Sequence, residues 1–380
     1  MMTDLWPGIL EVLNDRFDIK EILDLGTFDF NPSLLSGVFV KYKDYNFKST
    51  DRIIITHIDT QFYSSFSSIS MTLYNLHAAL SYYDIPTEFI LIFTNHYGIE
   101  RELDALASYF NFSSSIKSIT SFYDKIGTIN DAENIGINIT NINTPYILLN
   151  GQQRTHRLLL LSMLSEKKLL KNGMISYNFA HMLDQKDSYD STHHYKDPIQ
   201  YHTLSNPTRI NEHQILDNKS REILEKHLPT FINRTYVHQS IKGSPNDENT
   251  RWQPIFLQNA LIYLVSETVG DYPYPFMTEK TFKGFLIKRP MIIAGSRHSL
   301  KTLKELGFKT WDKWWDESYD NMEHFYQRAD HITDIIMRIS NLSIDDQHKI
   351  CLEMQEVLEY NFQHYIHKFC KTDYQEFLIK

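Results

Sequence analysis

Short runs of β-branched and other apolar residues alternate with segments of helical apolar spacing along the first half of the chain. The runs RIIITHI, EFILIFT and YILLN predict strands at residues 52–58, 88–94 and 146–150. Apolar residues recur at helical spacing over residues 70–83 and 100–110. Strands that alternate with helices are typical of βαβ units, so this pattern predicts a parallel sheet.

The second half of the chain repeats the alternation. It predicts strands at residues 174–179, 260–266 and 291–294, and helices at 154–170, 279–287 and 299–306. Gly307 ends the last of these helices, and a mostly helical pattern follows towards the C-terminus. Residues 184–249 are polar and rich in His, Asn, Asp and Pro, which indicates an insertion or a long connection.

A chain of 380 residues exceeds the usual size of a single core, so two domains are expected. We predict an N-terminal Rossmann-like domain over residues 1–145 and a second over residues 146–340, which carries the 184–249 segment. A C-terminal helical segment over residues 341–380 follows. The expected fold class is α/β, with two Rossmann-like domains facing a central cleft.

Charge and cysteine content narrow the function classes. Residues 1–150 hold 18 acidic and 9 basic residues, whereas residues 151–380 hold 29 of each. The acidic first part argues against an extended phosphate-tracking surface there, because nonspecific nucleic-acid binding depends on Lys and Arg. Cys351 and Cys370 form no disulfide framework, which favours a reducing compartment.

The N-terminal residues and the hydropathy pattern bear on location. The N-terminus lacks a basic stretch followed by an apolar one, so we expect no signal peptide. An apolar run of about 18 residues, long enough to suggest a membrane span, is not found in the sequence. We therefore predict a cytoplasmic protein without a membrane span.

The stretch 263–295 holds the first group of residues that suggest chemistry. Glu267 ends a predicted strand, and Thr278, Glu279 and Lys280 open the next predicted helix. Ligands of open α/β sheets bind beyond the carboxyl ends of the strands, where helix N-termini favour anions. Lys280 can bind a phosphate, and Glu267 or Glu279 can accept hydrogen bonds from sugar hydroxyls. The alternative is a purely structural cap, with Thr278 as the N-cap residue.

A second candidate corner follows the predicted strand 146–150. Arg154 and Arg157 lie one turn apart at the start of a strongly apolar helix. Two arginines near the positive end of a helix are electrostatically unfavourable unless an anion neutralises their charge, so this pattern favours a diphosphate-binding corner. The alternative is a basic helix start on a solvated face.

Asp59, His96 and Glu100 follow two predicted strands of the first domain. Each is a candidate general base that would deprotonate an acceptor hydroxyl. The alternative for each is a turn or capping residue.

Metal and dinucleotide motifs are weak in this sequence. The histidines of the polar segment match no zinc-ligand spacing, so a polar loop is favoured over a metal site. The chain contains neither GxGxxG nor GxxxxGK[ST], and no DxD motif follows a predicted strand.

Three segments of the second half of the chain resemble one known group of enzymes. Within residues 263–295, the block LVSET…PFMTEKTFKGFLIKRPMIIAG resembles the donor-binding motif of the α-1,3-fucosyltransferase-like glycosyltransferases. In that motif a strand ending in Phe-Glu-Asn leads to Tyr-x-Thr-Glu-Lys and then to Pro-x-x-x-Gly. NGQQRTHRLLLLSML and SLKTLKELGFKTWDKWWDESYD are similar to further segments of phage and bacterial members. The resemblance covers roughly residues 146–340, and the first 145 residues match only in their strand–helix style.

The resemblance assigns expected roles to the residues that match the motif. Glu279 would contact the donor ribose or sugar, and Lys280 would contact its diphosphate, with Thr278 and Glu267 standing on the same motif. Arg154 or Arg157 would neutralise phosphate. The strand here ends in Ser-Glu-Thr, and Met277 replaces a smaller residue, so the resemblance points to nucleotide sugars in general more than to fucose.

The resemblance also implies a fold and a reaction. It implies a GT-B fold, with residues 1–145 as the acceptor domain and 146–340 as the donor domain, no required cofactor or metal, and inversion at the anomeric carbon. The predicted activity is transfer of a fucosyl, hexosyl or pentosyl group from a GDP- or UDP-sugar to a hydroxyl, most simply of a glycan. One alternative acceptor is a hydroxymethylated or glycosylated DNA base of a phage, in the host cytoplasm. Another alternative is a non-catalytic nucleotide-sugar-binding protein.

Overall fold

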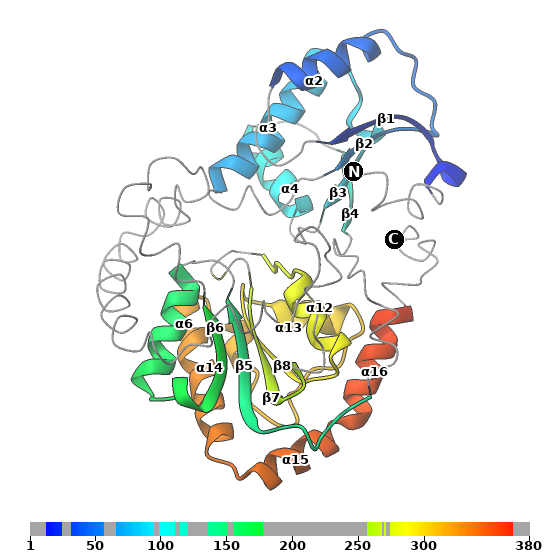
Figure 1. The fold of residues 1–380 in the computed structure, drawn as a ribbon. Helices are drawn as coiled ribbons and strands as arrows, with labels where there is room; N and C mark the ends of the chain where they lie inside the picture. The colour runs from blue at the N-terminus through cyan, green and yellow to red at the C-terminus, as the bar shows by residue number, and fades with distance from the viewer. Residues whose placement is uncertain are drawn as a thin grey trace. The chain divides into compact units, whose positions relative to one another are not determined.

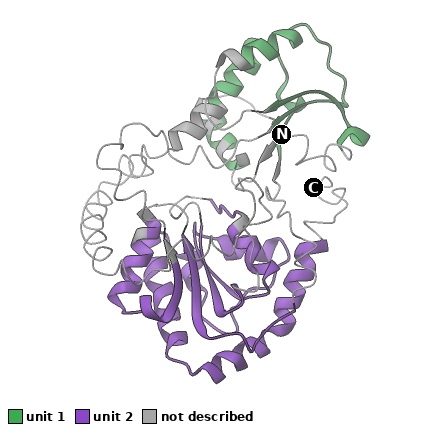
Figure 2. Ribbon diagram, viewed as in Figure 1, with its two compact units in different colours: residues 1–123, 193–210, 372–380 green, residues 124–192, 211–371 purple. Residues whose placement is uncertain are grey.

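The computed structural model divides into two compact units (Figures 1 and 2). Unit 1 comprises residues 1–123, 193–210 and 372–380, and unit 2 comprises residues 124–192 and 211–371. The structure describes residues 13–24, 32–56, 66–94, 99–110, 115–120, 136–150, 155–177, 257–267, 270 and 274–367. The predicted polar segment 184–249 therefore lies outside the described residues.

Unit 1 is built on a four-stranded parallel sheet with the order β1-β2-β3-β4. Its strands are β1 (Asp18–Asp24), β2 (Asp51–Thr56), β3 (Ile90–Thr94) and β4 (Lys117–Thr120). The helices whose bounds are described are α2 (Pro32–Phe39), α3 (Phe66–Tyr82) and α4 (Ile99–Phe110), with 3-10 turns η1 (Val40–Tyr42) and η3 (Thr87–Phe89). Each connection steps to the next strand in the same direction, and α2, α3 and α4 lie along one face of the sheet (Figure 1).

Unit 2 is also built on a four-stranded parallel sheet, but its order is β6-β5-β7-β8. The strands are β5 (Thr144–Asn150), β6 (Gly173–Tyr177), β7 (Ala260–Ser266) and β8 (Met291–Ala294). The helices between or just after them are α6 (Thr155–Glu166), α12 (Glu279–Leu286) and α13 (Ser299–Glu305), with the 3-10 turn η4 (Leu170–Asn172). The 3-10 turn η8 (Ser318–Asn321) leads to α14 (Phe325–Ser340), α15 (Ile344–Glu353) and α16 (Gln355–Tyr365).

The sheet of unit 2 is covered on both faces (Figure 1). Helix α14 packs on α6 and on β5 and β8, whereas α12 packs on β7 and on α16. Every residue of β7 is buried, as expected for a strand between two helical layers. Aromatic rings join α12 to its neighbours: the Phe285 ring stacks on Phe308 with centroids 4.2 Å apart, and Phe282 stacks on Tyr365 at 5.4 Å.

Four of the described helices, α3, α6, α12 and α13, are followed two residues later by a residue with left-handed backbone conformation. The φ angles are 53° at Asp84, 60° at Lys168, 50° at Lys288 and 91° at Gly307. After α6, the Leu169 N–H donates to the Leu164 carbonyl at 2.8 Å, which satisfies a carbonyl group at the helix end. This cap ends α6 at Glu166, four residues before the predicted end.

The prediction of an α/β fold with parallel sheets is confirmed for the described part of the chain. The strand predicted at residues 260–266 has the observed bounds, and the predicted helices at 279–287 and 299–306 are one residue longer than α12 and α13. Strands β1 and β4 were not predicted. The arrangement of the two units as a GT-B fold, and the domain boundaries at residues 145 and 340, stay predictions.

Candidate functional site

The carboxyl edge of the unit 2 sheet is the centre of the candidate site. The strands end at nearly the same level. The last residue of β5, Asn150, pairs with Tyr177 of β6, and the last residue of β7, Ser266, pairs with Ala294 of β8. Between β5 and β7 the last pair is Leu148 with Leu264, two residues before both strand ends. The connection through α6 runs outward from β5, and the connection through α12 runs outward from β7 in the opposite direction. The strand order therefore reverses between β5 and β7, and ligands of open α/β sheets bind at this kind of switch point.

Glu267 lies directly after β7 and is fully buried. Its Oε1 accepts hydrogen bonds from the Thr278 N–H at 3.0 Å and the Thr281 hydroxyl at 2.6 Å, and its Oε2 accepts one from the Thr278 hydroxyl at 2.7 Å. Gly295 leaves room for it, since a Cβ atom there would lie 3.1 Å from the Glu267 Cβ. The Glu267 carboxylate thus fixes the first turn of α12 to the end of β7.

Thr278 is the N-cap residue of α12, as the structural alternative predicted. Its hydroxyl accepts a hydrogen bond from the Lys280 N–H at 3.4 Å. The Lys280 ammonium donates to the same hydroxyl at 3.1 Å, and the residue is half-buried. Glu279 is the first residue of α12. The negative charge that a helix N-terminus favours is supplied here by Glu267, so the feature of this turn suited to an anionic ligand is the Lys280 ammonium.

Arg157 is brought to the same corner, but through the backbone. It is 3% exposed, and its Nη2 donates to the Ser266 carbonyl at 3.3 Å and to the Glu267 carbonyl at 3.0 Å. The Nε2 atom of His156 lies 2.8 Å from the same Glu267 carbonyl. The described hydrogen bonds of Arg157 therefore hold the end of β7, and its burial is incompatible with the solvated-face alternative. Arg154 lies outside the described residues.

Arg328 of α14 plays a similar part after β8, and the sequence interpretation missed it. It is 1% exposed, and its Nε donates to the Gly295 carbonyl at 3.1 Å. Its Nη2 donates to the Gly270 carbonyl at 2.6 Å. The only sequence signal is an arginine on the otherwise apolar face of a helix that contains Ala329 and Ile332.

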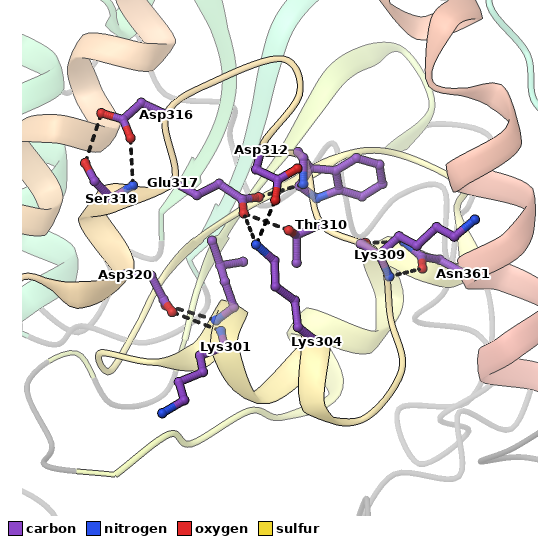
Figure 3. A network of polar contacts seen from close by, with 12 residues as sticks. Lys301, Lys304, Lys309, Thr310, Asp312, Asp316, Glu317, Ser318, Asp320 and Asn361 are labelled. Carbon is purple, nitrogen blue, oxygen red and sulfur yellow. Dashed lines mark hydrogen bonds and ion pairs between the residues drawn. The ribbon is translucent and has the colours of Figure 1, made fainter.

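The first turn of helix α13 also donates hydrogen bonds to a carboxylate of the chain (Figure 3). The Asp320 carboxylate accepts hydrogen bonds from the Leu300 N–H at 2.9 Å and the Lys301 N–H at 3.0 Å. Burial raises the pKa of Asp320 above its ordinary value, although these hydrogen bonds act in the opposite direction. Helices α12 and α13 therefore carry their own anions, whereas the first turn of α6 contains no acidic residue.

A second group of charged residues in the same view connects α13 to the following turn (Figure 3). The Lys304 ammonium lies 2.9 Å from Asp312 and 3.2 Å from Glu317. Glu317 also accepts hydrogen bonds from the Thr310 hydroxyl at 2.7 Å and the Trp311 N–H at 2.6 Å. Burial nevertheless raises the pKa of Glu317 above its ordinary value. These contacts stabilise the turn after α13.

The candidate bases of unit 1 are only partly described. Asp59 and His96 lie outside the described residues. Glu100 is in the first turn of α4 and exposed, and its Oε1 accepts hydrogen bonds from the Ser118 N–H and hydroxyl, both at 3.1 Å. Glu100 thus joins α4 to β4 in this structure.

The described residues contain neither a membrane-spanning helix nor a cluster suited to a metal ion. None of the described helices is long and apolar enough to cross a membrane. Among the same residues, no cluster of three or more His, Cys, Asp or Glu side chains has an arrangement suited to a metal ion.

Comparisons with known proteins identify no relative. The chain matches no protein-family model, and no match was found among curated proteins or among solved structures.

Proposed function

We propose that the chain is a glycosyltransferase whose nucleotide-sugar donor binds at the carboxyl edge of the unit 2 sheet. The observation that carries the proposal is the Glu267–Thr278–Lys280 corner at the switch point between β5 and β7. The same three residues belong to the block through which the sequence resembles the α-1,3-fucosyltransferase-like glycosyltransferases. Position in the fold and resemblance thus support one site.

In this proposal Lys280 and Glu267 have different roles. The Lys280 ammonium binds the diphosphate and stabilises the negative charge that develops on it when the bond to the sugar breaks. Glu267 is a positioning residue, because its carboxylate is buried and holds Thr278 and Thr281 at the start of α12. Its contacts fix the backbone that carries Lys280, so less order has to be created when the donor binds.

The second half of the reaction needs a base that takes the proton of the acceptor hydroxyl. Asp59, His96 and Glu100 remain the candidates for this role. The acceptor class, a glycan or a modified DNA base, also stays a prediction, as do inversion at the anomeric carbon and independence from metal.

Binding of the donor is tested first with the full-length protein and a panel of GDP-, UDP- and CMP-sugars in a thermal-unfolding assay. A ligand at about 100 times its Kd adds about 2.7 kcal/mol to the free energy of unfolding, which shifts the melting temperature measurably. Lys280→Ala should weaken donor binding by about 10- to 100-fold, because a charge-assisted contact is lost. Lys283→Ala, on the same helix, is the matched control and should bind like the wild type.

Turnover is tested by release of the nucleoside diphosphate from the donor that binds, with water and with added glycans or hydroxymethylated DNA as acceptors of the sugar. Release in the wild type and its loss in Lys280→Ala, but not in Lys283→Ala, support the proposed enzyme. Binding without release supports the non-catalytic alternative. Absence of any donor binding, or wild-type behaviour of Lys280→Ala, contradicts the proposed site.

A further inference from the structure

Two buried polar side chains end the central strands of the unit 2 sheet. Asn150 is the last residue of β5 and 1% exposed, and Ser266 is the last residue of β7 and 2% exposed. Within the described part of the chain, neither the Asn150 amide nor the Ser266 hydroxyl has a hydrogen-bond partner. The register of these neighbouring parallel strands pairs Leu148 with Leu264, two residues before Asn150 and Ser266. Because side chains alternate along a strand, Asn150 and Ser266 follow this pair on the same face of the sheet, at the switch point.

Two other buried amides of unit 2, those of Asn361 and Gln258, have hydrogen-bond partners within the chain. Asn361 is also 1% exposed, but its Oδ1 accepts from the Lys309 N–H at 2.9 Å and its Nδ2 donates to the Lys309 carbonyl at 2.8 Å (Figure 3). Gln258 is 2% exposed, and its Nε2 donates to the carbonyls of Gly136 and Ile287 at 3.0 and 2.9 Å. Because burying a polar group without a partner is costly, the pair at the switch point requires a partner from elsewhere.

We propose that Asn150 and Ser266 hydrogen-bond an uncharged donor–acceptor edge of the bound ligand. The inference rests on the proposed function, since it takes that ligand to be the nucleotide sugar. An amide offers N–H donors and a carbonyl acceptor together, and a hydroxyl can act as either. This set matches a nucleobase edge or sugar hydroxyls, whereas a diphosphate is better matched by cations such as Lys280.

The burial of both side chains has a consequence for this contact. Once made, the contact is shielded from water. Buried polar groups of this kind discriminate strongly against ligands that leave them unpaired.

The test compares Asn150→Leu with Asn361→Leu, two replacements of a buried amide by a branched apolar side chain. In the ligand-free protein, Asn361→Leu should lower the melting temperature, because it removes two hydrogen bonds, whereas Asn150→Leu should leave the temperature unchanged or raise it. In donor binding the order reverses. Asn150→Leu should weaken the Kd of the nucleotide sugar by about 10- to 100-fold, and Asn361→Leu should retain the wild-type Kd.

Three probes identify the part of the ligand that Asn150 contacts: the nucleotide sugar, its nucleoside diphosphate and inorganic pyrophosphate. If Asn150→Leu weakens the first two equally, the contact is to the nucleobase or ribose. If it weakens only the nucleotide sugar, the contact is to the transferred sugar. If it weakens pyrophosphate as strongly as the others, the contact is to the diphosphate, and the inference is wrong.

Ser266→Ala is the milder second variant, which decides the question if Asn150→Leu does not fold. It should weaken nucleotide-sugar binding by about 3- to 10-fold. Wild-type Kd values in both variants would show that the Asn150 amide and the Ser266 hydroxyl make no hydrogen bond to the ligand. That result would refute the inference while leaving the proposed function intact. If the wild type itself binds no nucleotide sugar, the proposed function is contradicted, and the inference that rests on it falls as well.

Discussion

Units 1 and 2 use the same kinds of elements, yet they place their helices differently. In unit 1 the strands follow one another in sequence order across the sheet, so successive helices lie on one face. In unit 2 the order is β6-β5-β7-β8, and the helices that follow β5 and β7 cover opposite faces. Only this second order creates a switch point among the described strands. Two parallel sheets with similar sequence patterns can therefore differ in whether their strand order creates a switch point.

The two units also differ in the burial of the carboxylate that joins a helix to a strand. Glu267 in unit 2 is fully buried and accepts three hydrogen bonds, whereas Glu100 in unit 1 is exposed and accepts two from Ser118. We expect Glu267→Ala to lower the free energy of unfolding by about 2–4 kcal/mol, since it leaves buried donors unpaired. Glu100→Ala should cost less than about 1 kcal/mol, because water can replace the carboxylate.

Urea unfolding measures the free energy of unfolding of Glu267→Ala and Glu100→Ala. Far-UV circular dichroism follows both units, and tryptophan fluorescence follows unit 2 in particular through Trp311, Trp314 and Trp315. Equal losses in the two variants would contradict the difference between the two carboxylates.

Glycines within helices provide a second pair. A Cβ at Gly284 of α12 would lie 1.8 Å from the Sδ atom of buried Met291, whereas a Cβ at Gly37 of α2 would meet nothing within 4 Å. Alanine favours helices over glycine by about 0.5–1 kcal/mol, so Gly37→Ala should stabilise unit 1 by about this amount. Gly284→Ala should destabilise unit 2 by about 1–3 kcal/mol, because the core must shift to admit the methyl group.

The two glycine variants share one measurement, the urea midpoint, and they should move it in opposite directions. A stabilising Gly284→Ala would show that Met291 repacks at little cost. That result would mean that the contact between α12 and β8 has room for an added methyl group.

Dependence of stability on pH is the smallest of the three expected differences. Burial raises the pKa of Glu317 in unit 2, so the folded chain binds this proton more readily than the unfolded chain. The resulting stabilisation is present below the unfolded pKa and is lost as pH rises through the folded pKa. Urea unfolding at a series of pH values should therefore show stability of unit 2 falling across this window, and Glu317→Gln should reduce the fall.

Asp51 in unit 1 should act with the opposite sign. Burial opposes the shift, but a hydrogen bond from the Lys48 N–H and the ion pair with the Lys20 ammonium lower the pKa of Asp51. Its contribution is present above the unfolded pKa and is lost as pH falls through the folded pKa. Asp51→Asn should reduce that loss at acid pH, and a change of the same sign in Asp51→Asn and Glu317→Gln would contradict the comparison.

The sequence predicted the elements whose signals are local. The bounds of β7 follow from an uninterrupted apolar run, and Thr278 was recognised as an N-cap because capping depends on a few adjacent residues. Strand β4 was missed because KSIT is short and contains only one apolar residue, and β1 because DIKEILD carries four charged residues. The end of α6 was misplaced because Lys168, rather than a glycine, adopts the left-handed conformation of its cap.

The candidate site depended more on contacts between distant parts of the chain. The position of Glu267, Thr278 and Lys280 at one sheet edge was predicted from the strand–helix pattern. The burial of Arg157 was not, because its carbonyl acceptors come from Ser266 and Glu267, more than 100 residues later in the sequence. Asn150 was seen only as the end of a strand, since its neighbour Ser266 is set by the register of β5 with β7.

The arginine contacts bear on how this protein can change over evolutionary time. Arg157 and Arg328 tie α6 and α14 to the chain after β7 and β8 through hydrogen bonds to carbonyl oxygens. Because every residue has a carbonyl oxygen, substitutions beyond these strands can leave the bonds in place. Gly270 is an exception, since a Cβ there would lie 2.5 Å from the His156 Cβ. The sheet edge can thus acquire new side chains without loss of the framework beneath it.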